Sequence, residues 1–102
     1  MFRKLFKSKD DYAFSDPKNT ACMVCSHVLR ENAPILRVTH DEDDGMWQFL
    51  CGNENHLVEH AKTIALSEAV SIDTSINELH EMPLGVGATR ESKNEKWQPF
   101  KL

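Results

Sequence analysis

The chain has 102 residues, of which 40% are hydrophobic and 27% are charged, and these are the proportions of an ordinary globular protein. This length fits one domain with a modest core and excludes a large multidomain enzyme. The apolar runs are far shorter than the roughly 20 residues of a membrane-spanning helix, and no secretion signal is evident, so we expect a cytoplasmic protein.

The formal net charge of -4 is unevenly distributed along the chain. Residues 1–9 contain four basic side chains and no acidic one, which leaves the remainder with 8 basic and 16 acidic side chains. An acidic body repels phosphate groups, so neither a nucleic acid nor a membrane is an expected partner. We interpret residues 1–15 as a basic N-terminal tip, a short amphipathic helix or a frayed end, and residues 16–102 as one α+β domain.

The first element after the tip is predicted to be a buried strand over residues 20–28, because this segment is apolar and is bounded by polar clusters. A β-hairpin is predicted next, over about residues 35–51, and it turns through the acidic segment 41–45, which ends in a glycine. The apolar side chains of the returning strand are expected to share one face: Trp47, Phe49 and Cys51.

The second half of the chain is predicted to contain helices. Apolar residues at helical spacing predict a helix over about 54–66, and the segment 68–72 fits either a helix or a strand. A capping-box pattern from Ser75 predicts a further helix, which ends before Pro83. Residues 84–90 are then predicted to form a glycine-containing strand that another group approaches closely. The fold class is therefore α+β: one small domain with a mainly antiparallel sheet, the hairpin at its centre and two or three short helices packed on it.

Three cysteines without an export signal indicate free thiols in a reducing compartment. Cys22 and Cys25 have zinc-knuckle spacing. Cys51 and one histidine would complete a set of four ligands, the histidine being His27, His40, His56 or His60. The intervening segment is apolar, and a straight strand would point Cys22 and Cys25 to opposite faces. We therefore interpret the cysteines as core residues and expect no metal or cofactor, with a structural zinc site as the alternative.

No group of residues in the sequence predicts catalysis. His56 and His60 form an H-x-x-E-H pattern, but too few residues follow it to build a metalloprotease cleft, so we expect exposed helix histidines. Gly85 and Gly87 lack the third glycine of a dinucleotide-binding loop. Because no nucleophile accompanies the carboxylates, we assign no catalytic residue and do not expect an enzyme.

Four successive acidic residues occupy the turn of the predicted hairpin: Asp41, Glu42, Asp43 and Asp44. Like charges at a surface contribute little to stability, so we interpret the turn as a recognition element. The predicted binding residues are Asp41, Asp43, Asp44 and the neighbouring aromatic residue Trp47. The competing interpretation is that Asp41 or Asp44 orders the turn by accepting backbone N–H groups.

Three segments carry a resemblance to a known family: residues 40–52, which read HDEDDGMWQFLCG, and residues 72–79 and 82–90. Over about residues 20–98 the chain resembles a bacterial family of small proteins of unknown function that are similar to predicted immunity proteins of polymorphic toxin systems. The resemblance implies a small α+β domain that acts by binding, and it implies no catalytic residue. With the acidic body, it predicts an immunity-like protein that binds a basic partner such as a toxin, since complementary charge speeds encounter. A small zinc-binding protein is the alternative function.

Overall fold

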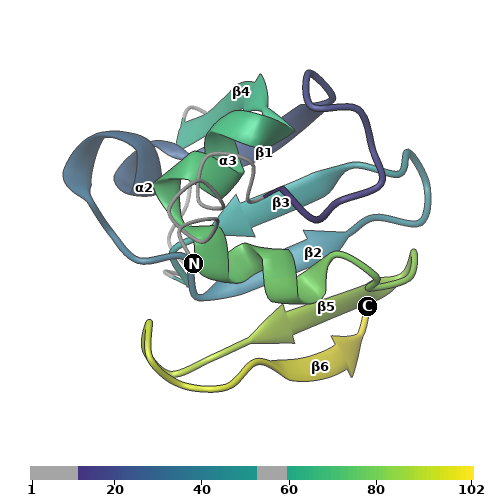
Figure 1. Cartoon of the computed structure of the whole chain (residues 1–102). Helices are drawn as coiled ribbons and strands as arrows, with labels where there is room; N and C mark the ends of the chain where they lie inside the picture. The colour runs from purple at the N-terminus through teal and green to yellow at the C-terminus, as the bar shows by residue number, and fades with distance from the viewer. Residues whose placement is uncertain (1–11, 53–59) are drawn as a thin grey trace, which may run out of the picture.

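The computed structural model describes residues 12–52 and 60–102, in which six strands form one mixed sheet in the order β4-β1-β3-β2-β5-β6 (Figure 1). The strands are β1 (Ala21–Cys25), β2 (Arg37–His40), β3 (Trp47–Leu50), β4 (Ala61–Ala65), β5 (Val86–Thr89) and β6 (Gln98–Lys101). The described helices are α2 (Ser26–Glu31), α3 (Leu66–Ile72) and the 3-10 helix η3 (Thr74–Leu79). Figure 1 shows α3 and η3 lying in front of the sheet. The predicted α+β class is therefore confirmed.

The predicted hairpin is confirmed as the centre of the sheet, where β2 and β3 pair antiparallel. One row of directly paired residues crosses four strands and has no solvent exposure: Val24, Phe49, Val38 and Ala88. All four side chains of this row point to the same face, because the register aligns them and side chains alternate along a strand. This row forms the floor of the hydrophobic core.

The glycine-containing strand is approached as closely as its sequence predicts. A Cβ atom at Gly87 of β5 would lie 2.6 Å from the ring of Phe100 on β6. The guanidinium of Arg37 lies over the same ring, 4.8 Å from its centroid. The absence of a side chain at position 87 therefore lets the C-terminal strand pack flat against β5.

The predicted helix over about 54–66 is wrong where the structure describes it. Residues 61–65 form β4, which pairs with β1 along its whole length, from Ala21 opposite Ala65 to Cys25 opposite Ala61. The apolar spacing of this segment is also compatible with a strand, and the hydrogen bonds to the open edge of β1 decide the outcome. Residues 53–59, with His56, lie outside the described residues.

One other boundary differs from the sequence prediction. The strand predicted over 20–28 ends at Cys25, where the chain turns directly into α2. The segment 68–72, which fitted either a helix or a strand, belongs to the helix α3. Phe14, assigned to the tip, is only 5% exposed and packs edge-on against Trp47. The core therefore includes residues before position 16, whereas residues 1–11 lie outside the described part of the chain. No helix among the described residues is long and apolar enough to cross a membrane.

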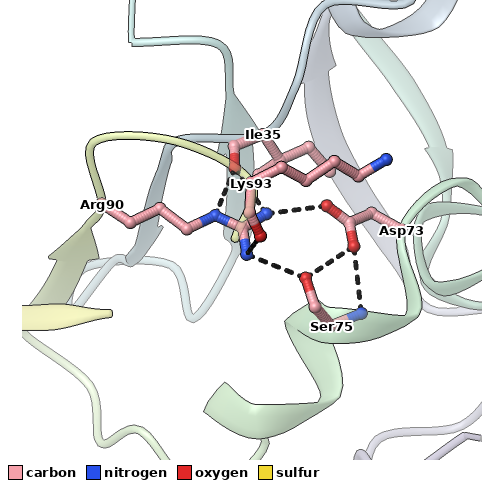
Figure 2. Close-up of polar contacts among 5 residues, drawn as sticks. All are labelled: Ile35, Asp73, Ser75, Arg90 and Lys93. Carbon is pink, nitrogen blue, oxygen red and sulfur yellow. Dashed lines mark hydrogen bonds and ion pairs between the residues drawn. The ribbon is translucent and has the colours of Figure 1, made fainter. Parts of the chain in front are cut away.

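A buried ion pair joins the helices to the sheet (Figure 2). Arg90, directly after β5, is 7% exposed, and its Nη2 donates to Oδ2 of Asp73 at 2.8 Å. Its Nε and Nη2 also donate to the Ile35 carbonyl, and its Nη1 donates to Ser75 Oγ and to the Lys93 carbonyl. All five N–H groups of the guanidinium therefore have acceptors.

The carboxylate of Asp73 is equally well satisfied. Its Oδ1 accepts hydrogen bonds from the amide and the hydroxyl of Ser75, at 3.0 and 2.6 Å. Asp73 thereby caps η3 while its other oxygen holds Arg90. The pair fixes the junction of α3 and η3 over the end of the sheet.

We expect Arg90→Met to lower the free energy of unfolding by about 3–5 kcal/mol, because it leaves the buried carboxylate of Asp73 without its counter-ion. Urea denaturation measures the loss. Arg37→Met is the matched control, since Arg37 is only half-buried and is expected to cost about 1 kcal/mol or less. Equal losses in the two variants would contradict the role assigned to the Arg90 network.

Candidate functional site

The acidic turn between β2 and β3 is ordered by two of its own carboxylates. Oδ1 of Asp41 accepts the amide N–H of Asp43 at 2.8 Å, and Oδ1 of Asp44 accepts that of Met46 at 2.9 Å. Gly45 completes the turn with a φ of 72°. These bonds bear out the competing interpretation, in which Asp41 and Asp44 have a structural role. Asp43 and its neighbour Glu42 are exposed.

Trp47 does not belong to a surface site. Its side chain is 1% exposed, between the edge-on ring of Phe14 and the ring of His40, which is stacked 3.8 Å away at an interplanar angle of 12°. A strand residue beside the turn is exposed only if it points away from the core, and Trp47 shares the core face with Phe49. Its assignment as a binding residue is therefore corrected to a core residue.

A second acidic segment lies next to the turn. Nδ1 of His40 donates to the Met82 carbonyl at 2.8 Å, and the amide of Gly85 donates to the His40 carbonyl at 2.8 Å. These two bonds hold the segment between η3 and β5 against the start of the turn. This segment contributes the exposed carboxylate of Glu81, and the last turn of η3 directly before it contributes that of Glu78.

These carboxylates border a groove of about 480 Å³ between η3 and the last two strands. Its lining is apolar along the floor and charged at the rim: Leu79, Met82, Ala88, Trp97 and Pro99, with Glu78, Glu81 and Lys96. We call this set of eight residues the acidic groove. Sequence reasoning did not assign its members to a site, because they come from three segments and share no motif.

The cysteines fall into two environments. Cys22 is fully buried as the second residue of β1, and burial raises the pKa of its thiol from 9.0 to about 12, with the negative charge of Glu68 adding to the rise. A thiol that keeps its proton is a poor ligand and a poor nucleophile. Cys22 thus has the role of a small core hydrophobe that the sequence predicts for it.

Cys25 and Cys51 meet at one edge of the sheet. β1 and β3 are parallel neighbours, so their carboxyl ends lie together, and Cys25 is the last residue of β1 while Cys51 directly follows β3. His27 joins them from the first turn of α2. The ligand atoms of these three residues all lie within 4.8 Å of one another.

The other candidate histidines differ in position. His40 is held by Trp47 and the Met82 carbonyl, at the opposite end of β2–β3 from Cys51. His60 directly precedes β4, whose first residue pairs with Cys25, and its ring centroid is 4.8 Å from that of His27. The zinc alternative built on Cys22 is therefore corrected: among the described residues, the metal-type group is Cys25, His27 and Cys51.

Comparison of the chain with protein-family models, with curated proteins and with solved structures gave no match.

In the acidic turn, Asp41→Ala and Asp44→Ala are each expected to lower the free energy of unfolding by about 0.5–1.5 kcal/mol, the usual value of one hydrogen bond. Asp43→Ala is the matched control, and its exposed side chain should cost less than about 0.5 kcal/mol. Asp41→Asn should recover most of the loss, because its amide oxygen still accepts the N–H. Thermal or urea denaturation gives these values, and a neutral Asp41→Ala would contradict the structural role.

The stability of the protein should fall as the pH rises from about 9 toward about 12. In this range the unfolded chain loses the Cys22 proton while the folded chain retains it, so deprotonation favours unfolding. In Cys22→Ala the decline should be shallower, because the thiol that is coupled to folding is gone. Urea denaturation from about pH 7 to about pH 10.5 measures the two slopes, and identical slopes would show that Cys22 is not coupled to folding.

Proposed function

We propose that this protein is a small binding module that recognises a basic protein partner through the acidic groove. Two observations carry the proposal: Glu78 and Glu81 line one apolar depression, and the segment that follows η3 is bonded to the start of the acidic turn, which carries Glu42 and Asp43. The turn adds negative charge, and the segment around Glu78 and Glu81 offers both charge and apolar area. Together they match a partner segment that carries basic and apolar side chains.

The two parts of the acidic groove have different physical roles. Exposed carboxylates attract a basic partner over about one Debye length and raise the rate of encounter, but they add little affinity once screened by salt. The apolar floor formed by Leu79, Met82 and Trp97 provides the area whose burial stabilises the complex. Lys96 at the rim would repel the same partner, so the charge pattern also favours one orientation.

An immunity-like role is the form of this function that we favour. A protein that masks a toxin needs fast association and a surface complementary to it, and the acidic body of the chain supports both. The resemblance over about residues 20–98 points in the same direction. This role needs no catalytic residue.

The test is site-specific photo-crosslinking in cells that express the protein. A photoreactive amino acid replaces Lys96 in the acidic groove or, as the matched control, Lys62 on β4 at the opposite edge of the sheet. We expect a discrete crosslinked partner with a basic surface from position 96 and none from position 62. Equal crosslinking at both positions would contradict recognition through the groove.

The partner then allows a kinetic test of the carboxylates. Glu78→Gln with Glu81→Gln is expected to lower the association rate constant by about 10-fold at low salt, because the steering charge is removed. Glu31→Gln on α2 is the control and should change it by less than about 2-fold. An unchanged rate in the double variant would exclude these carboxylates from recognition.

A further inference from the structure

We propose that the protein binds one zinc ion through Cys25 Sγ, His27 Nδ1 and Cys51 Sγ, at the edge of the sheet where β1 and β3 end. This site is separate from the acidic groove and does not depend on the function proposed for it. It uses one cysteine of the Cys22–Cys25 pair, and it takes its other two ligands from α2 and from the chain after β3.

The three donors are arranged much like three corners of a tetrahedral zinc site. Tetrahedral zinc with Zn–S of about 2.3 Å and Zn–N of about 2.0–2.1 Å places its ligand atoms roughly 3.5–3.8 Å apart. Sγ of Cys51 and Nδ1 of His27 are 3.8 Å apart, and all three ligand atoms lie within 4.8 Å of one another. Small side-chain rotations are therefore enough to close the group around an ion.

The chemistry of the three donors suits zinc. Two thiols lose their protons on binding, so two thiolates balance the +2 charge, and the neutral imidazole adds none. Thiolate and imidazole ligands suit zinc, whereas calcium and magnesium require oxygen ligands. The site also has access: Cys25 is 1% exposed, but Cys51 and His27 are only half-buried, so an ion can enter from solvent.

The backbone explains why the three donors converge although 26 positions separate Cys25 from Cys51. Parallel pairing of Val24 with Phe49 brings both strands to their ends at the same level of the sheet. α2 starts at the next residue after Cys25 and returns His27 over that edge. An ion here would join β1, α2 and the segment after β3, which no disulfide links. It would thus act as a structural clamp.

The experiment is a metal titration of the full chain after removal of metal with a chelator under reducing conditions. Cobalt(II) serves as the spectroscopic probe, and zinc is then added in competition. We expect one cobalt ion per chain, a thiolate-to-cobalt charge-transfer band, tetrahedral d–d bands, and displacement by one equivalent of zinc. The midpoint of thermal unfolding should rise when zinc is added to the metal-free protein.

Variants identify the ligands. Cys51→Ala and His27→Ala are each expected to weaken zinc binding at least about 100-fold, beyond what changes around a metal site usually cost. Their matched controls, Cys22→Ala and His80→Ala, should stay within about 3-fold of the wild type, because these residues lie outside the group. Since Cys51 and His27 are half-buried, their loss should leave the fold intact, which circular dichroism verifies.

Three outcomes would overturn the proposal. The first is that the wild-type chain gives no charge-transfer band and binds no stoichiometric metal. The second is that Cys22→Ala loses the metal as completely as Cys51→Ala does. The third is that both ligand variants fold and bind zinc as tightly as the wild type. The first outcome would leave the thiols as core residues alone, and the second would restore the Cys22–Cys25 pair as the ligands.

Discussion

The buried guanidinium of Arg90 is the interaction on which the arrangement of the other elements depends. It fastens the end of β5 to the chain before β2, to the junction of α3 and η3, and to the β5–β6 loop. The ring of Trp97 lies over it, 4.0 Å from the guanidinium carbon to the ring centroid, and Trp97 is also a wall of the acidic groove. Because every donor of the guanidinium is used, another placement of these segments would leave buried polar groups unsatisfied. The helix layer and the groove are thus positioned by one side chain.

The parts of the fold that could be predicted are those with local causes. The alternation around Val38 and Phe49, together with Gly45 in the turn, contains enough information for the central hairpin. The strand β4 has no such signal, because its apolar residues fit a helix as well as a strand, and its pairing with β1 decides between them. Two of the partners of Arg90, Ile35 and Asp73, are likewise distant in sequence, and no pattern in the sequence connects them.

The candidate sites show the same division. The acidic turn could be predicted, and so could the role of its aspartates in ordering it. The burial of Trp47 could not, because it depends on which face of β3 meets the core. Zinc-knuckle spacing pairs Cys22 with Cys25, yet in the structure only Cys25 of this pair belongs to the metal-type group. Cys25 and Cys51 come together because β1 and β3 pair in parallel, although β2 lies between them in sequence. Spacing along the chain does not reveal such a contact.

The parallel pair also favours one order of folding over others. In the hairpin, His40 and Trp47 meet across a loop of a few residues, but Met23 and Gln48 of the parallel pair are 25 positions apart. Closing the longer loop costs more entropy, and it gains little before the hairpin exists as a template. We therefore expect β1 to dock late, onto a preformed β3. The thiols of Cys25 and Cys51 then become lasting neighbours only as the sheet is completed, so the group of Cys25, His27 and Cys51 is assembled late in folding.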